Sequence, residues 1–364
     1  MESINNKIHL YVFEFFSGIG GMHDALLSNT STISIQKIYP FDINQNANLT
    51  YEYNYNTKPY SISIESFTLL KYNSICKSIY EEPSNFNNNN PKRILWTMSP
   101  PCQPFTRQGN CEGLSDNRST AFKHLINELF LKTEYKPDYF LLENVKNFET
   151  SEANELLLNA FKSNNYIYKQ FLLSPIQFNI PNSRLRFYVI AMKSSKQHTT
   201  TITTSNDIIT DTKLFDDDIL PEKSISEYLN IKDIVNYEKH IDKRYYLTEK
   251  VLNKESSKAM DVVLFESKSS NCFTKNYTRL IKGSGSILLT DSKLYSDNID
   301  LGSCKGKLRF FSPEEILSFM CFKEEFEFPE AISVKSKYRL LGNSINVYVV
   351  GKLFKYLFSL AQEE

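Results

Sequence analysis

The chain has 364 residues, of which 41% are hydrophobic and 13% aromatic, so it can build two ordinary domains or one large domain with a smaller insertion. Lysine plus arginine equals aspartate plus glutamate at 42 each, and the formal net charge is zero. This neutrality excludes nucleic-acid binding through a basic tail or a histone-like surface. A local basic surface that binds nucleic acid is still compatible with zero net charge, because the electrostatic attraction of a ligand depends on how the charges are distributed.

No segment predicts export or a membrane anchor. Residues 1–9 lack a basic start followed by an apolar run, and nowhere are eighteen consecutive residues apolar. The six cysteines form no CxxC pair, which argues against a zinc site or a disulfide framework. We therefore expect a soluble, intracellular protein with reduced thiols, no bound metal and no contact with membranes.

The first half of the chain alternates strands with helices. Apolar runs at 8–16 and 33–41 predict buried strands, while the residues after 21 and the segment 47–55 predict helices. A weaker third strand is expected at 62–65. This order predicts an α/β fold, a Rossmann-like, doubly wound sheet with helices on both faces.

A glycine turn, Ser17–Gly21, joins the first strand to the first helix. Its glycines let the backbone approach a ligand that faces the helix N-terminus, although most glycine-rich turns are only tight connections. Asp42 follows about twenty residues later, at the end of the second strand, where folds of this kind hold ribose hydroxyls. Together the two signals favour a nucleotide-like cofactor.

A proline loop, residues 99–107, follows a strand expected at 94–98. Its three prolines exclude a helix or a continued ladder and leave Cys102 few positions. Such restriction suits a nucleophilic thiol, although an arbitrary cysteine is more often a small buried apolar residue. The asparagine tract at 85–90 is typical of a solvated insertion, and residues 109–116 have the composition of a lid.

A strand expected at 139–142, between helices at 120–131 and 152–161, is followed by Glu143. Ligands of open parallel sheets bind at the carboxyl ends of the strands, so Glu143 and Cys102 are expected at one edge. The alternative for Glu143 is an ordinary acid at a helix N-terminus.

A hairpin is expected between 171–173 and 186–192, and it contains Arg184 and Arg186. Two residues apart on a strand, these arginines would point to the same face and could hold a phosphate or carboxylate together. The alternative is a pair of exposed arginines that protects an edge strand.

The composition changes at 194–218, which predicts a linker, and 222–303 predicts short helices and strands, including 271–274 and 283–289. Basic residues there interleave with two aromatic rings, a pattern compatible with phosphate contact and base stacking, or simply with a solvated face. They are Lys268, Lys275, Arg279 and Lys282, with Phe273 and Tyr277. Ser312 and Pro313 predict a helix start, and Gly342–Ser344 would begin a closing helix that runs to Leu360.

Five motifs, in this order, resemble the cytosine-5 methyltransferases that use S-adenosylmethionine: Phe15–Gly21, Ser99–Phe105, Glu143–Val145, Arg184–Arg186 and Gly342–Ser344. Other segments are similar to the subfamily that methylates aspartate tRNA at cytosine 38 of the anticodon loop, historically classed with DNA (cytosine-5) methyltransferases. They are Phe105–Arg107, Cys272–Thr274, Arg309–Ile316 and Leu340–Val347. Asn182, where the wider family has glutamine, also suits that subfamily.

The resemblance implies a class I methyltransferase sheet formed by 1–192 and 331–364, with a smaller target-recognition domain at 193–330. It implies tRNA as the partner, tRNA-Asp above all, with DNA possible, and a site in the cytoplasm or nucleus. We expect a monomer. A covalent adduct of Cys102 with carbon 6 of cytosine would activate carbon 5, assisted by Glu143, Arg184 and, with less weight, Arg186.

The resemblance also implies the residues around the two ligands. The cofactor set comprises Phe15, Ser17, Gly18, Ile19, Gly20, Gly21, Asp42, Ile43, Ile64, Glu65, Ser99, Pro101, Asn343 and Ser344. The substrate set comprises Arg107, Gln108, Gly109, Cys272, Phe273, Thr274 and Lys275.

Two other functions stay open. A DNA (cytosine-5) methyltransferase would use the same chemistry, although Cys272–Thr274 and the short recognition domain count against it. A catalytically silent nucleic-acid-binding protein on the same fold is disfavoured, because Cys102, Glu143, Arg184 and the glycine turn are all present.

Overall fold

The computed structural model describes residues 7–81, 91–101, 119–194, 207–296 and 298–363. Two compact units divide the chain. Unit 1 comprises Met1–Leu173, Leu185–Asp211 and Val350–Glu364, and unit 2 comprises Ser174–Arg184 and Thr212–Val349. Cys102, Arg107, Gln108, Gly109, the asparagine tract and the expected lid lie outside the described residues. The functional domain boundaries given above stay a prediction.

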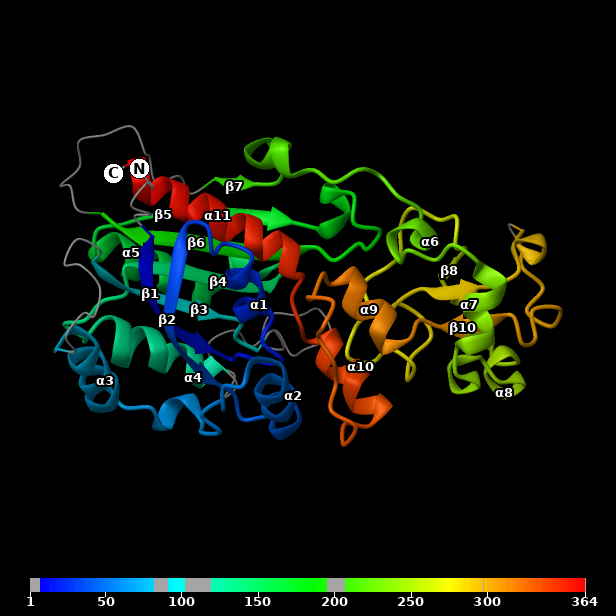
Figure 1. Cartoon of the computed structure of the whole chain (residues 1–364), viewed down its shortest axis with the longest axis horizontal. Coiled ribbons are helices and arrows are strands. Elements are labelled where there is room, and N and C mark those ends of the chain that lie inside the picture. The colour runs from blue at the N-terminus through cyan, green and yellow to red at the C-terminus, as the bar shows by residue number, and fades with distance from the viewer. Residues whose placement is uncertain (1–6, 82–90, 102–118, 195–206, 297, 364) are drawn as a thin grey trace, which may run out of the picture. The chain divides into compact units, whose positions relative to one another are not determined.

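Unit 1 is built on a seven-stranded sheet with the order β2-β1-β3-β4-β6-β5-β7 (Figure 1). The first four strands in this order are parallel, β6 is antiparallel to both of its neighbours, and β7 pairs with β5 in parallel. The strands are β1 (Ile8–Phe15), β2 (Ile33–Phe41), β3 (Lys92–Met98), β4 (Tyr139–Val145), β5 (Tyr166–Leu173), β6 (Arg186–Lys193) and β7 (Ile208–Ile209). The predicted mixed α/β fold is confirmed.

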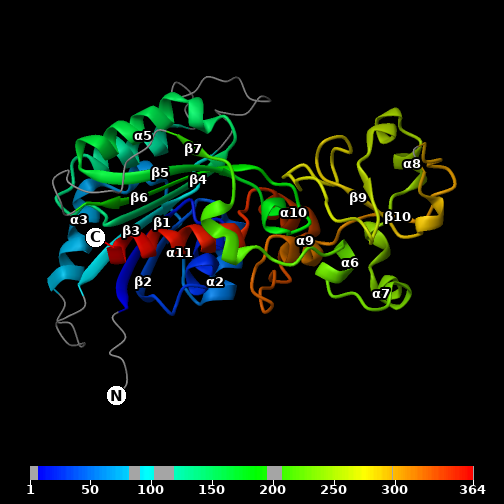
Figure 2. The ribbon, with the colours of Figure 1, turned by 90° about the horizontal axis from the view of Figure 1, so that it is seen from above.

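Helices cover both faces of this sheet, as neighbouring residues of β4 show. The Tyr139 ring packs on Phe358 of α11, whereas the Phe140 ring packs on Phe161 of α5. Successive strand residues point to opposite faces, so α11 and α5 lie on opposite sides of the sheet (Figure 2). The helices of unit 1 are α1 (Gly21–Leu27), α2 (Gln45–Tyr55), η1 (Ile64–Ser66), α3 (Leu69–Glu81), α4 (Thr120–Lys123), the π-helix η5 (His124–Phe130), η6 (Phe148–Thr150) and α5 (Glu152–Ser163), with α11 (Val347–Glu363) continuing into it from unit 2.

Aromatic rings fill the face of the sheet that α3, η5 and α5 cover. The Trp96 ring lies edge-on to Phe15 at 5.1 Å and to Tyr72 at 5.3 Å between centroids, and its Nε1 donates to Tyr72 Oη at 3.1 Å. Edge-to-face packing of this kind adds to the large area that these rings bury. The apolar runs of β1 and β3 therefore place the ends of those strands on a rigid base.

Unit 2 has much less regular structure. Its three-stranded sheet has the order β10-β9-β8, and each strand has only two or three residues. Its elements are η7 (Pro175–Phe178), η8 (Lys213–Asp218), α6 (Ile225–Tyr228), α7 (Ile234–His240), η9 (Lys243–Tyr245), α8 (Glu249–Leu252), η10 (Glu255–Ala259), β8 (Val262–Val263), β9 (Ile287–Leu289), η11 (Ser292–Leu294), β10 (Leu308–Phe310), α9 (Pro313–Phe319) and α10 (Val334–Gly342). Ser312 caps α9 with Pro313 at its first position, as predicted.

Several element predictions were wrong. Residues 62–65 form no strand: Ser66 donates from both its amide and its hydroxyl to the Ser63 carbonyl, and this local bonding closes the turn η1 instead. Residues 271–274 have no regular structure, and the expected linker contains β7 and η8. Gly342 is the last residue of α10, Asn343 and Ser344 follow it, and the closing helix begins only at Val347.

Among the described residues, no helix combines the length and the apolar character that crossing a bilayer requires.

Candidate active site

The strand order places a ligand-binding edge between β1 and β3. The chain leaves β1 through α1 to β2 on one side, then returns past β1 to β3 on the other. Open α/β sheets bind ligands at the carboxyl ends of the strands where the order reverses in this way. The glycine turn follows β1 and Ser99 follows β3 at this point, and the Ser99 amide donates to the Phe15 carbonyl at 3.4 Å.

Asp42 holds the glycine turn. Its Oδ2 accepts from the Gly18 amide at 2.9 Å and its Oδ1 accepts from the Asn44 amide at 2.8 Å. Burial raises the pKa of this carboxyl, while the hydrogen bonds from the amides act in the opposite direction. The ribose contact expected of Asp42 remains a prediction, but the carboxylate already fixes the backbone around it.

Gly20 is required by both conformation and space. Its φ is +90°, and a Cβ atom there would lie 2.3 Å from the Tyr55 ring of α2. The positive φ disfavours any residue with an L side chain, and the first carbon of such a side chain would clash with Tyr55. The turn is thus shaped by the packing of α2 as well as by its own glycines.

The expected cofactor residues differ in what they offer. Ser17 Oγ and Ser99 Oγ are buried atoms with no hydrogen-bond partner among the described residues, and a ligand with polar groups would relieve that cost. Ile43 is 70% exposed and offers an apolar surface directly after Asp42. The core contains the side chains of Phe15, Ile19 and Ile64, which therefore pack under the site and are not free to contact a ligand. Gly21 begins α1. Two of the expected cofactor residues are exposed, Glu65 and Pro101. These residues fit a nucleoside cofactor that enters at the strand ends.

Glu143 and Arg186 form an ion pair at the end of β4. Arg186 Nε lies 3.3 Å from Glu143 Oε1, and the two side chains are only 15% and 9% exposed. Val145 pairs directly with Arg186, so Glu143, two residues earlier, shares its face of the sheet on the diagonal. Glu143 therefore lies within β4, whereas the sequence analysis placed it just after the strand. Such a shielded pair can hold the polar edge of a planar ligand.

Asn144 ties the same strand to the start of the proline loop. Its Nδ2 donates to the Pro100 carbonyl at 3.1 Å, and both groups are buried. This bond holds the Pro100 carbonyl, two residues before Cys102, beside the strand that contains Glu143.

The prediction that Arg184 and Arg186 lie on one face of a strand was wrong, because only Arg186 belongs to β6. Arg184 precedes β6, so the alternation of a strand does not apply to it. It belongs to unit 2, is 2% exposed, and donates to Cys272 Sγ and to the carbonyls of Phe273, Gly342 and Ser344.

Neither of the two interpretations left open for the basic and aromatic residues, base stacking or a solvated face, fits the rings of Phe273 and Tyr277. Both rings are buried, 1% and 2% exposed, and they pack against each other at 5.0 Å in the core of unit 2. Lys268 is held by Glu222. What the 272–275 segment offers is partly exposed side chains at Cys272, Thr274 and Lys275.

The end of α10 lies against this segment. A Cβ atom at Gly342 would lie 2.0 Å from the Lys275 amide nitrogen, so the two backbones are in direct contact. Asn343 then caps α10 with its side chain exposed, and Ser344 is buried. Within unit 2, the structure thus brings together expected substrate residues and expected cofactor residues.

Two buried clusters escaped sequence reasoning. In unit 1, Tyr51 Oη lies 2.7 Å from Glu14 Oε2 and 2.9 Å from His23 Nδ1, and burial raises the pKa of Glu14 to about 8. The signal available in the sequence was a single acid inside an apolar strand.

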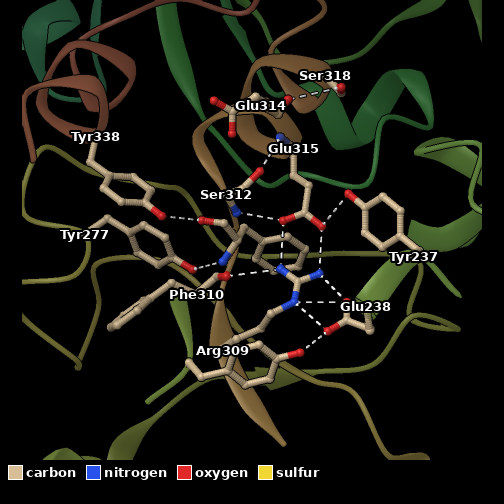
Figure 3. A network of polar contacts seen from close by, with 12 residues as sticks. Tyr237, Glu238, Tyr277, Arg309, Phe310, Ser312, Glu314, Glu315, Ser318 and Tyr338 are labelled. Atoms are coloured by element: carbon tan, nitrogen blue, oxygen red, sulfur yellow. Dashed lines mark hydrogen bonds and ion pairs between the residues drawn. The ribbon is translucent and has the colours of Figure 1, made fainter. Parts of the chain in front are cut away.

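In unit 2, the fully buried Arg309 lies between two carboxylates. Figure 3 shows its guanidinium facing both Glu315 and Glu238, with the closest N···O distances 2.8 and 2.7 Å. Burial lowers the pKa of Arg309, but the two bonded carboxylates outweigh burial and raise it. No short-range pattern could have indicated a partner as distant as Glu238.

Comparison with known proteins decides the family. The model of the C-5 cytosine-specific DNA methylase family matches residues 10–359. The chain belongs to this family.

Relatives of this methyltransferase match it over nearly its whole length. It is 37% identical to a Dictyostelium discoideum protein named DNA (cytosine-5)-methyltransferase, covering 97% of this chain and 96% of the relative. It is 36% identical to a tRNA (cytosine(38)-C(5))-methyltransferase of Schizosaccharomyces pombe, covering 97% of each. The family predicted from the five motifs is confirmed.

A solved structure agrees. The crystal structure of S. pombe Dnmt2 methyltransferase matches this methyltransferase with a TM-score of 0.75 at 33% identity, covering 97% of this chain and 99% of the other. The chain is therefore a cytosine-C5 methyltransferase that acts on nucleic acid, with the fold of its relatives.

Proposed function

We propose that this enzyme methylates carbon 5 of cytosine in tRNA, at position 38 of the anticodon loop of tRNA-Asp. The observation that carries the proposal is the Glu143–Arg186 ion pair beside the proline loop. It is supported by relatives named tRNA (cytosine(38)-C(5))-methyltransferase at 36% identity. The other features of the site are consistent with this chemistry.

S-adenosylmethionine is the proposed methyl donor, and when bound it supplies an electrophilic methyl group. The amides of the glycine turn, the hydroxyls of Ser17 and Ser99, and Asp42 are the groups we assign to hold it. Ile43 would cover an apolar part of the donor. Asn343 and Ser344 are proposed to complete the set.

Cys102 is the proposed nucleophile. Attack of its thiolate on carbon 6 forms a carbon–sulfur bond and breaks the double bond between carbons 5 and 6. Ring nitrogen 3 takes up a proton, which makes carbon 5 an enamine carbon able to accept a methyl group. Carbon 5 would then take the methyl group as its bond to the sulfonium sulfur of the donor breaks, which would leave the neutral thioether S-adenosylhomocysteine. Loss of the carbon-5 proton to water restores the double bond between carbons 5 and 6 and expels the thiolate, and nitrogen 3 returns its proton to Glu143.

Glu143 and Arg186 are proposed to control the charge on the base during this attack. Glu143 would hydrogen-bond the Watson–Crick edge and hold the proton that nitrogen 3 takes up, while Arg186 would bind the carbonyl oxygen. We therefore assign to Arg186 the leading role in binding the base that the sequence analysis gave to Arg184. The preformed ion pair fits this division of work, because both side chains are nearly shielded from water.

RNA is favoured over DNA as the substrate. The base must leave its stack to reach the thiol, and this costs less in a single-stranded loop than in a duplex. We propose a monomer that works in the cytoplasm or nucleus, with 193–330 as the target-recognition domain.

The experiment uses labelled S-adenosylmethionine with an aspartate tRNA transcript or a cytosine-containing duplex, followed by bisulfite mapping. We expect label at one anticodon-loop cytosine, abolished by Cys102→Ala and retained by Cys304→Ala, a matched change at a buried cysteine of unit 2. Label in neither polymer would contradict the proposal.

DNA methylation is the second candidate, favoured by the name of the Dictyostelium discoideum relative. Label in the duplex but not in tRNA would establish it and leave the proposed roles of Cys102, Glu143 and Arg186 intact.

A further inference from the structure

Arg184 joins three segments of unit 2 that are far apart in sequence. Its Nη1 donates to Cys272 Sγ at 3.3 Å and to the Phe273 carbonyl at 3.2 Å. Its Nη2 donates to the Gly342 carbonyl at 3.3 Å and to the Ser344 carbonyl. The guanidinium therefore has bonds to the expected substrate segment on one nitrogen and to the expected cofactor segment on the other.

The acceptors explain why a cation is buried there. The carbonyls at the end of a helix lack intrahelical partners and carry partial negative charge, and Gly342 is the last residue of α10. The 271–274 segment belongs to no strand or helix, so its carbonyls also need donors. Arg184 supplies donors to one carbonyl of the 271–274 segment, that of Phe273, and to the carbonyls of Gly342 and Ser344.

Neighbouring bonds hold Arg184 itself in place. Its amide donates to Ser174 Oγ at 2.9 Å, and the Ser183 amide donates to the Ser270 carbonyl at 2.8 Å. Asn182 Nδ2 donates to the Asn271 carbonyl at 3.1 Å. Residues 182–184 therefore run along 270–273, and the guanidinium cannot swing toward a ligand without breaking several buried bonds.

The opposing segments leave no room for adjustment. The backbone of Gly342 touches the backbone of Thr274 and Lys275, where a Cβ atom would lie 2.0 to 2.4 Å from their atoms. Any slip of one segment against the other would break the bonds to Arg184, since its planar fork fixes the direction of each donor.

We propose that Arg184 is a positioning residue that locks Cys272–Thr274 and Asn343–Ser344 in one register, so that the base-binding and donor-binding segments are set together. It does not touch the base. The inference rests on the proposed function for the role of the two segments, while the lock itself is a property of unit 2.

The test compares Arg184→Lys with Arg186→Lys, the same change two residues apart. Lysine has a single head group and lacks the fork, so it can serve fewer of the four acceptors. S-adenosylmethionine binding is measured by calorimetry without RNA, and steady-state kinetics are measured with the tRNA transcript. Hydrogen exchange of both variants is followed segment by segment.

We expect Arg184→Lys to raise the dissociation constant of S-adenosylmethionine and the KM of the tRNA about 10-fold each, with kcat at saturation lowered less than about threefold, because binding geometry is lost and the chemistry is kept. Arg186→Lys should instead lower kcat about 100-fold and leave S-adenosylmethionine binding unchanged. Exchange at 272–275 and 340–345 should rise only in Arg184→Lys, while β1–β4 stay protected and report that the protein is folded.

The inference would be overturned if Arg184→Lys bound S-adenosylmethionine with wild-type affinity but lost much of its kcat. Arg184 would then be assigned to binding the base. Unchanged exchange at 272–275 and 340–345 would also overturn it, whatever the ligand. Failure of the wild-type enzyme to bind S-adenosylmethionine would count against the proposed function instead, and the exchange result would still decide the lock.

Discussion

The two units stabilise their polar groups in different ways. In unit 1, seven strands form one sheet, and an aromatic core supports the strand ends where Asp42 and Glu143 lie. In unit 2, strands of two or three residues pair little of the backbone, and the buried arginines Arg184 and Arg309 bind the segments that the sheet does not reach. Residue type alone therefore does not give an arginine its role. Arg186 faces a carboxylate at a strand end, whereas Arg184 and Arg309 hold a unit together.

The largest expected effect is in unit 2. Arg309→Met would leave the buried Glu315 and the partly buried Glu238 without this cationic partner, and losses of this kind are about 3 to 5 kcal/mol. Hydrogen exchange at 234–240 and 308–319 should rise steeply. The unfolding transition followed by Trp96, the single tryptophan, should move much less, because Trp96 lies in unit 1.

Arg244→Met is the matched control, since Arg244 pairs with Asp242 on the surface. If Arg244→Met lowered the stability as much as Arg309→Met, the burial of the Arg309 ion pairs could not explain the loss.

Gly20→Ala tests the turn of unit 1. The left-handed backbone and the clash with Tyr55 together should cost about 1 to 3 kcal/mol, and S-adenosylmethionine should bind more weakly. Urea unfolding followed by Trp96 fluorescence measures the first effect, and calorimetry the second.

Gly18→Ala is the comparison for the clash. Gly18 also has a positive φ, +54°, but no atom lies within 4 Å of the position that an added methyl group would occupy. Its loss should be smaller than that of Gly20→Ala, and an equal loss would mean that Tyr55 moves aside without cost.

Glu14→Gln tests how the buried carboxyl group of Glu14 in unit 1 changes the pH dependence of the stability. The folded pKa of Glu14, about 8, lies above its ordinary value of 4.5, so folding favours the protonated form. Its stabilising contribution is complete below about pH 4.5 and is lost as the pH rises toward 8. We expect wild-type stability, relative to Glu14→Gln, to fall by at least about 1 kcal/mol between pH 5 and 8. Parallel pH profiles of the two proteins in urea unfolding would contradict this.

The smallest effect is expected at the surface. Lys305 pairs with Glu249, and both side chains are more than 60% exposed. Lys305→Ala should leave the unfolding midpoint unchanged within error, because exposed pairs are screened by water and salt. A clear loss would mean that surface pairs also hold unit 2 together.

Sequence reasoning succeeded where the deciding contacts are local. The strands β1 to β4 and the glycine turn follow from apolar runs and from residues close together in the chain. The family followed from five short motifs for the same reason, and the comparisons confirm it. Even the residues after each strand could be placed at one edge, because parallel strands share their direction.

It failed where distant segments decide the outcome. Arg184 and Arg186 were taken to share a face, but the strand begins only at Arg186. Base stacking was one of two interpretations left open for Phe273, yet its ring fills a core formed with Phe311 and Phe319, which no local pattern reveals. Cys102 lies outside the described residues, so its role stays a prediction.

The contact at the end of α10 also has a consequence for how the gene can vary. A saturation library at codon 342, selected for methylation in cells, should retain the four synonymous glycine codons and lose every missense allele. Serine, alanine and cysteine should disappear as completely as tryptophan, since even one methyl group would meet the Lys275 backbone. Drift at this site is then confined to the third base, and a coding change there would have to arise together with a shift of the facing segment.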